Sequence, residues 1–155
     1  VNCHVVVGLG ETDRDLVELF YQLRTEEIAA YLFSFNPEPG TAMAGHPRPS
    51  LDRWRRIQVT KYLIERHDLP PEAIEFDGEG ALAGVRAPRA MVEACLEEGV
   101  AFMTNGCPDR NGRMACNRPF GSYRPGEAFR DYPFRPEAGD RPVIRAETRF
   151  EDLLT

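Results

Sequence analysis

Two cysteines in the last third of the chain have the residue type and the setting for metal chemistry. Cys107 stands between Gly106 and Pro108, and Cys116 begins the run Cys116-Asn117-Arg118-Pro119-Phe120. Two thiolates at a glycine-containing turn can hold half of an iron–sulfur cluster or a zinc ion. Because eight residues separate the two cysteines, more than in a Cys-x-x-Cys clamp, a disulfide and two idle thiols remain as alternatives.

The opening stretch has the composition of a ligand-binding turn. A β-branched run, Val5-Val6-Val7, ends in Gly8-Leu9-Gly10 and is followed by Glu11 and Thr12. The run predicts a buried strand, the glycines permit a sharp turn or the close approach of a ligand, and Thr12 is a suitable helix N-cap. The spacing lacks the third glycine of a dinucleotide fingerprint and the Gly-Lys-Ser/Thr of a phosphate loop. The alternative is a tight turn whose glycines only satisfy backbone geometry.

Other polar residues are weaker candidates. The loop Asp77-Gly78-Glu79-Gly80 offers two carboxylates to a ligand or a metal, although such loops are more often solvated turns. The histidines are too dispersed for a metal triad, but His4 shares the strand face of Val6 and Gly8 and is a candidate for the site. The tail is rich in arginine, which can bind a carboxylate or a carrier protein, with a solvated surface as the simpler interpretation. These arginines are Arg110, Arg113, Arg118, Arg124, Arg130 and Arg135.

Alternating strand and helix patterns position these residues. Apolar residues at helical spacing predict helices over 13–24, 51–67 and 88–98, and short apolar runs predict strands over 5–7, 28–35, 73–76 and 100–104. Such alternation predicts parallel strands with right-handed helical crossovers. Residues 107–141 lack periodicity but contain many aromatic residues, which predicts an ordered, irregular extension over one end of the sheet. Residues 142–150 are predicted to be extended.

The carboxyl ends of the four predicted strands carry glycine or small polar residues. Ligands of parallel sheets bind outside these strand ends. We therefore expect one nucleotide-sized site where four segments meet: residues 8–11, 34–36, 77–80 and 104–107.

Composition excludes several classes of partner. The net charge of −6 gives no reason to expect nucleic acid or an anionic membrane as a partner. No apolar run approaches the roughly 18–20 residues that span a bilayer, and no signal peptide is visible. Cys95 lies in a helical pattern and is expected in the core, and Cys3 adjoins a buried strand, which suits reduced thiols. A cytoplasmic protein is predicted.

Three segments resemble radical S-adenosylmethionine (SAM) enzymes, particularly the biotin synthase and lipoyl synthase branch. In that family a G-x-I-x-G-x-x-E pattern on the fifth strand of a partial (β/α)6 barrel packs on the adenine of SAM. In this sequence Val6, Gly8 and Glu11 match the pattern, and His4 stands in place of its first glycine. Residues 36–43 are similar to the family's Pro-x-x-Gly-Thr-Pro-type loop. Residues 104–119 resemble a Cys-Pro…Cys-Asn-Arg-Pro segment that closes the barrel mouth and is a candidate for binding an auxiliary cluster.

The resemblance implies a fold and an activity. Residues 1–106 would form the C-terminal half of a partial (β/α)6 TIM-type barrel with about four parallel strands, and residues 107–155 an irregular closing extension. The Cys-x3-Cys-x2-Cys motif that holds the SAM-cleaving [4Fe–4S] cluster is absent, so a fragment of a longer enzyme is expected. The implied reaction is hydrogen abstraction by a 5′-deoxyadenosyl radical, with sulfur insertion, as in lipoyl or biotin synthesis, as the leading subclass. The implied partners are a small-molecule or carrier-bound substrate and an electron donor such as ferredoxin or flavodoxin.

The predicted site residues follow from these arguments. The predicted contacts to SAM are Val6, Gly8, Gly10, Glu11, Asn36 and Asp77, and the predicted ligands of an auxiliary iron–sulfur cluster are Cys107 and Cys116. Two other classes of protein compete with this interpretation. One is a non-catalytic module that binds SAM or another nucleotide, and the other is a zinc-stabilised interaction domain.

Overall fold

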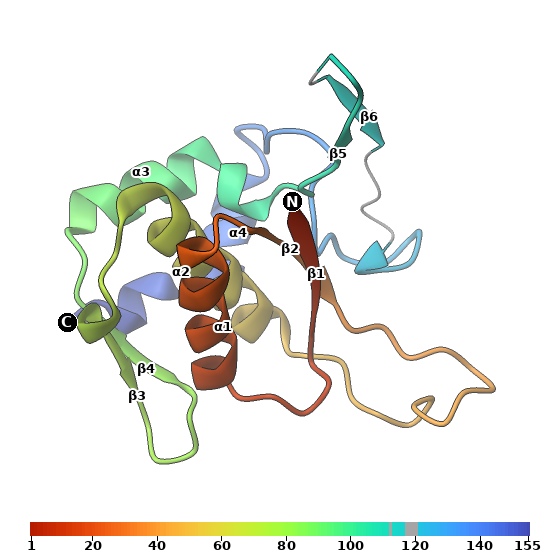
Figure 1. Ribbon diagram of the computed structural model, residues 1–155, viewed down its shortest axis with the longest axis horizontal. Coiled ribbons are helices and arrows are strands. Elements are labelled where there is room, and N and C mark those ends of the chain that lie inside the picture. The colour runs from red at the N-terminus through yellow and green to blue at the C-terminus, as the bar shows by residue number, and fades with distance from the viewer. Residues whose placement is uncertain (112, 117–120) are drawn as a thin grey trace.

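The computed structural model describes residues 1–111, 113–116 and 121–155 (Figure 1). The chain begins with one βαβ unit made of strand β1 (Asn2–Val7), helix α1 (Asp13–Thr25) and strand β2 (Ala29–Ser34). β1 and β2 are parallel, with a Cα register that runs from Asn2 opposite Ala29 to Val7 opposite Ser34. The strand, helix and parallel strand predicted for this part of the chain are confirmed.

The start of α1 is set by its first residues. The Thr12 hydroxyl accepts a hydrogen bond from the Asp15 N–H (3.1 Å), and the Asp15 carboxylate accepts one from the Thr12 N–H (2.8 Å). This reciprocal capping box satisfies two backbone donors that a helix N-terminus otherwise leaves without partners. The predicted N-cap at Thr12 is confirmed.

Helix α2 (Leu51–His67), rather than a sheet, lies at the centre of the molecule. Trp54, Ile57 and Leu63 are fully buried, and the polar Arg55 and Gln58 are buried as well. A helix that is buried on nearly all sides must be covered by several elements. These are α1, the 3₁₀ turn Val100–Phe102 and helix α4 (Arg141–Thr148).

The predicted barrel half with about four parallel strands is wrong. The described residues form three separate two-stranded sheets, and of these only β1–β2 is parallel. Strand β3 (Ile74–Phe76) was expected to join a parallel sheet but pairs with β4 (Leu82–Val85) in an antiparallel hairpin. The reason is local: Asp77 Oδ1 accepts the N–H groups of Glu79 and Ala81 (both 2.9 Å) and closes the turn between the two strands.

Two further predicted strands are also wrong. Residues 100–102 form a 3₁₀ turn after Gly99, whose φ of +73° ends helix α3 (Arg89–Glu98) and redirects the chain. The turn inserts Phe102 completely into the core. The segment 142–150, predicted to be extended, lies mostly in α4 (Arg141–Thr148) instead, because Pro142 suits a first helical turn and Ile144 and Thr148 lie one turn apart on the buried face.

The last residues of the chain return to β4, where the Thr155 N–H donates to the Val85 carbonyl oxygen (3.2 Å). In the part of the chain that the structure describes, no helix combines the length and the apolar composition needed to cross a lipid bilayer. Among the described residues, the structure also has β5 (Cys107–Pro108), β6 (Met114–Cys116) and the 3₁₀ turns Pro71–Ala73 and Phe150–Leu153.

Candidate functional site

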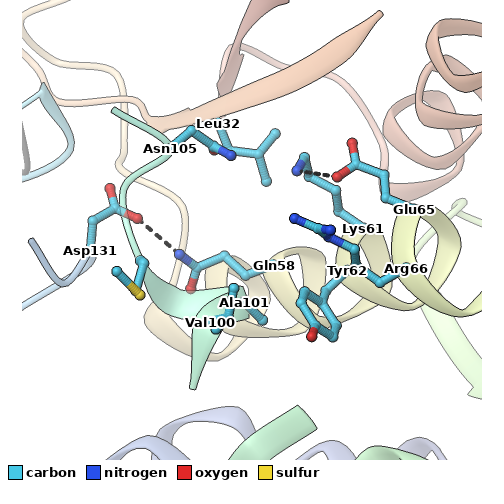
Figure 2. A pocket seen from close by; sticks show the side chains of 11 residues that line it. Leu32, Gln58, Lys61, Tyr62, Glu65, Arg66, Val100, Ala101, Asn105 and Asp131 are labelled. Carbon is cyan, nitrogen blue, oxygen red and sulfur yellow. Dashed lines mark hydrogen bonds and ion pairs between the residues drawn. The ribbon is translucent and has the colours of Figure 1, made fainter. Parts of the chain in front are cut away.

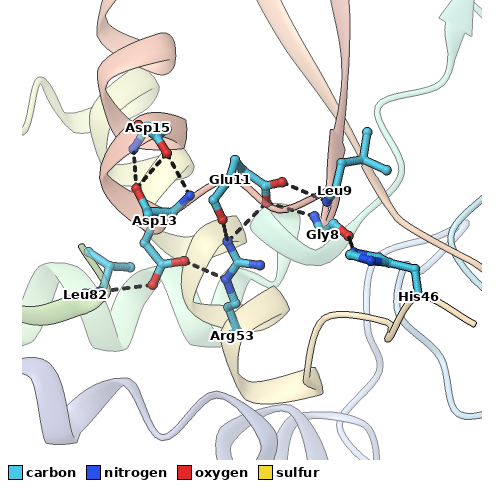
Figure 3. Close-up of polar contacts among 9 residues, drawn as sticks. Gly8, Leu9, Glu11, Asp13, Asp15, His46, Arg53 and Leu82 are labelled. Carbon is cyan, nitrogen blue, oxygen red and sulfur yellow. Dashed lines mark hydrogen bonds and ion pairs between the residues drawn. The ribbon is translucent and has the colours of Figure 1, made fainter. Parts of the chain in front are cut away.

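The glycine turn after β1 is built around one carboxylate. Glu11 accepts the backbone N–H groups of Gly8 and Leu9, each at 2.8 Å, and pairs with Nη2 of Arg53 at 3.0 Å (Figure 3). Partial burial raises the pKa of Glu11, but the backbone hydrogen bonds and the charge of Arg53 outweigh this and lower it below its usual value. Glu11 is therefore ionised, and its hydrogen bonds stabilise the backbone conformation of the turn.

Arg53 connects this turn to two other elements. From the first turn of α2, its Nε donates to Asp13 Oδ1 (2.7 Å) and its Nη2 donates to the Glu11 carbonyl oxygen (2.9 Å). The second oxygen of Asp13 accepts the Leu82 N–H of β4 (3.0 Å). Asp13 is nine-tenths buried, so these bonds hold α1, α2 and the β3–β4 hairpin in one arrangement around the turn.

Gly8 is required by close packing as well as by its backbone conformation. It has a φ of +105°, and a β-carbon added there would lie 2.6 Å from Cδ of Pro49. On its other side the Gly8 carbonyl oxygen accepts a hydrogen bond from Nε2 of His46 (2.9 Å). Because a carbonyl oxygen only accepts, this nitrogen carries the proton. Gly8 is thus packed against the loop that joins β2 to α2, and this packing explains the glycine.

One face of the β1–β2 pair is left partly open. Val5 and Val7 lie on the covered face, whereas the opposite face carries His4 and Val6 of β1 with Tyr31 and Phe33 of β2, in register. The His4 ring stacks on Tyr31 and meets Phe33 edge-on, with centroid distances of 5.9 and 5.2 Å. Parallel strands are normally covered on both faces. This aromatic surface is consequently a candidate for contact with a ligand or a partner.

A hollow of about 280 Å³ adjoins this face at the carboxyl ends of both strands. Val6 and Phe33 supply apolar walls, and Asn36 lies on the polar side. Glu38 and Arg124 also line the hollow and form an ion pair with each other. A hollow with apolar walls and a few polar groups is typical of small-molecule sites, and this one is at the small end of their size range.

The structure brings only some of the predicted site residues together. Val6 and Asn36 line the hollow, and Gly8 and Glu11 form the turn beside it. Gly10 is exposed, with a φ of +115° and nothing within 4 Å of where a β-carbon would lie. Asp77 lies in the β3–β4 turn, where its carboxylate closes that turn. The four predicted strand ends do not meet at one edge, because only β1 and β2 belong to a parallel pair.

The two predicted metal ligands face each other in the backbone. Strands β5 and β6 are antiparallel, and their register places the α-carbon of Cys107 opposite that of Cys116. The other cysteines behave as expected: Cys95 is buried, and burial together with Glu98 raises the pKa of its thiol to about 12. Within residues 1–111, 113–116 and 121–155, no group of three or more histidine, cysteine or acidic side chains is arranged to hold a metal ion.

A smaller cavity of about 70 Å³ lies between α2, Leu32 of β2 and the 3₁₀ turn Val100–Phe102 (Figure 2). Gln58, Lys61 and Asp131 contribute polar groups to its wall, and Gln58 Nε2 donates to Asp131 Oδ1 (2.9 Å). Burial raises the pKa of Asp131 to about 7, against the opposing effects of Ser122, Arg55 and other donors. The volume suits a few water molecules rather than a nucleoside.

Comparison with protein-family models, with curated proteins and with solved structures found no match to this chain. The fold and the site define the class only as a small α/β domain with a ligand-type hollow at the end of a parallel strand pair. Sequence reasoning did not identify Arg53 or His46 as parts of the site. No local pattern marks them, because Arg53 and His46 lie about 40 positions further along the chain than the residues of the glycine turn that they contact.

Proposed function

We propose that this chain binds SAM at the carboxyl ends of β1 and β2 and belongs to a radical SAM enzyme. The observation that carries the proposal is the hollow beside the glycine turn, with Val6 and Phe33 on its apolar side and Asn36 on its polar side. The adenosyl group of SAM has the matching character, with a flat ring system and a polar edge. The resemblance of residues 8–12 to the adenine-binding segment of the family supports the same position.

The residues present do not fit the catalytic cluster. The sequence has no Cys-x3-Cys-x2-Cys run, and the described residues offer no group of three ligands. The cysteines that hold the cluster would therefore belong to another part of the enzyme. The proposed reaction class is hydrogen abstraction by a 5′-deoxyadenosyl radical, and the proposed subclass within it is sulfur insertion. A small or carrier-bound substrate and a ferredoxin- or flavodoxin-type donor are the corresponding partners.

Calorimetric titration with SAM tests the binding site. Val6→Asp places a charge against the ring-binding wall, and Val143→Asp, at another exposed valine, is the matched control. We expect wild-type protein and the Val143 variant to bind SAM, and the Val6 variant to bind it at least about tenfold more weakly. Equal affinity of all three proteins, or no binding by the wild type, would contradict the proposal.

The catalytic proposal and a binding module without catalysis differ in their products. The protein isolated anaerobically from its source, with any segments or subunits that accompany it, is supplied with SAM and a reductant. Formation of 5′-deoxyadenosine supports the radical enzyme. SAM binding without this product supports the non-catalytic module.

A metal clamp at Cys107 and Cys116 is a second candidate, favoured by their opposed backbone positions in β5 and β6. Two thiolates are half of a tetrahedral set, so the other ligands must come from another segment, subunit or small molecule. Elemental analysis of anaerobically purified protein distinguishes the forms: iron with visible absorption indicates an auxiliary cluster, and colourless zinc indicates an interaction domain. The paired Cys107→Ser and Cys116→Ser variant should lose the metal, whereas Cys3→Ser should retain it.

A further inference from the structure

Beneath the carboxyl end of β2, one arginine is held without a carboxylate partner. Arg130 is half-buried and its Nη1 donates to the Ser34 hydroxyl (3.0 Å). Among the described arginines that are buried or half-buried, it alone forms no ion pair. The other six are Arg48, Arg53, Arg55, Arg56, Arg141 and Arg145, and each pairs with a carboxylate.

The surroundings of Arg130 are unfavourable for a positive charge. Burial and the nearby charges of Arg48 and Arg55 lower the pKa of Arg130 to about 10. The acidic neighbours are engaged elsewhere, since Glu127 accepts Arg48 Nη1 (2.9 Å) and Asp131 accepts Gln58 Nε2 (2.9 Å). Both acidic groups raise the pKa of Arg130, but burial and the two arginines outweigh them. A partly desolvated charge of this kind costs free energy unless a counter-charge is bound.

Arg48 has an unsatisfied donor in the same cluster. Its Nη1 and Nη2 donate to Glu127 and to the Ser122 carbonyl oxygen (3.3 Å), but its Nε is buried and has no hydrogen-bond partner. Buried N–H groups are nearly always satisfied, so an orphaned one requires an explanation. An anion bound between the two guanidinium groups would satisfy Arg48 Nε and neutralise Arg130.

The backbone that carries Arg130 is fixed independently of its side chain. The Arg130 carbonyl oxygen accepts hydrogen bonds from Trp54 Nε1 (2.6 Å) and Arg55 Nη1 (2.7 Å), and the Phe129 carbonyl oxygen accepts one from Arg55 Nη2 (2.5 Å). Trp54 and Arg55 are fully buried in α2. The guanidinium is therefore presented from a rigid support, as pre-organised binding groups are.

We propose that Arg130 and Arg48 form an oxyanion-binding subsite that takes the carboxylate or phosphate group of a small-molecule ligand. Ser34, whose hydroxyl accepts from Arg130, also lines the hollow beside Val6, so the subsite would adjoin that hollow through Ser34. Paired guanidinium donors match the planar oxygens of a carboxylate and the oxygens of a phosphate. The subsite does not depend on SAM being the cofactor, because simple anions suffice to test it.

The test titrates wild-type protein with butyrate and with inorganic phosphate at constant ionic strength, with chloride as the reference anion, and follows thermal unfolding and heat of binding. We expect saturable binding and a raised midpoint of unfolding for at least one probe. Arg130→Gln should weaken that binding about 10- to 100-fold, as expected when a charge-assisted contact is lost. Arg89→Gln removes the same charge from an exposed position of α3 and should leave the affinity unchanged.

Each outcome decides the proposal. Preference for butyrate identifies a carboxylate ligand, and preference for phosphate identifies a phosphorylated one. Without anion, Arg130→Gln should be at least as stable as wild type, because the backbone hydrogen bonds at residue 130 remain and the repulsion from Arg48 and Arg55 is relieved. If this variant does not fold, Arg130→Lys keeps the positive charge but loses the planar guanidinium group, and it should also bind the anion more weakly. Wild-type affinity in the Arg130 variants, or stabilisation by the probes no greater than by chloride, would overturn the subsite.

Discussion

Replacing Gly8 by alanine tests how tightly the turn at the candidate site is packed. The new β-carbon would lie 2.6 Å from Cδ and 3.1 Å from Cγ of Pro49, and 3.3 Å from Cβ of Phe35. Overpacking of this kind costs about 1–3 kcal/mol. Holding alanine at the φ of +105° costs about 1–3 kcal/mol more. We therefore expect Gly8→Ala to reduce the free energy of unfolding by about 2–6 kcal/mol.

Gly10→Ala provides the matched control for the backbone contribution. Gly10 has a similar φ of +115°, but nothing lies within 4 Å of the added β-carbon. Its substitution should cost only the conformational part, about 1–3 kcal/mol. Urea unfolding followed by tryptophan fluorescence of the buried Trp54 measures both variants. If the two variants lose the same stability, the contact with Pro49 does not constrain the turn and the reasoning is refuted.

Three further predictions concern other parts of the structure. Arg53→Gln should lower the free energy of unfolding, measured in urea, by about 2 kcal/mol, because it leaves the partly buried carboxylates of Glu11 and Asp13 without their partner. The control Arg86→Gln, at an exposed ion pair, should lower it by less than about 1 kcal/mol. Asp131 has a pKa of about 7 in the folded protein and about 4 in the unfolded chain. Between these pH values the native state therefore binds the extra proton, and the free energy of unfolding falls as pH rises, by up to about 4 kcal/mol. Asp131→Asn should remove this part of the pH dependence of unfolding, and an unchanged slope would contradict the burial of the carboxyl group. Thr12→Ala should cost about 1 kcal/mol and increase amide hydrogen exchange in the first turn of α1; exchange equal to that of wild type would mean that the capping box is not formed in solution.

The parts of the fold that the sequence predicted are those determined by neighbouring residues. Gly8, Thr12 and Asp15 specify a turn and a helix start through bonds that span at most a few positions. Gly99 ends α3 in the same way, through its own positive φ. Such signals can be read because the donor, the acceptor and the required backbone conformation all occur within one short segment.

The failures share a different cause. Residues 74–76 were recognised as a strand, but the strand pattern does not specify a partner, and the Asp77 turn made the nearest segment the partner. Residues 100–104 are a short apolar run whose periodicity fits a buried strand or a buried turn. In the structure Gly99 and the insertion of Phe102 beside α2 decide in favour of the turn.

The candidate site divides along the same line. The sequence by itself determined the βαβ unit and the glycine turn, and it identified Val6, Gly8, Glu11 and Asn36 as residues near a strand end. Only the tertiary structure decided that Glu11 is bonded to the turn and to Arg53, and that Arg130 lies beside Ser34, 96 positions away, without a carboxylate partner. The physical reason is that local backbone geometry is encoded within a few residues, whereas these charge arrangements depend on which surfaces of the central helix α2 each distant segment covers.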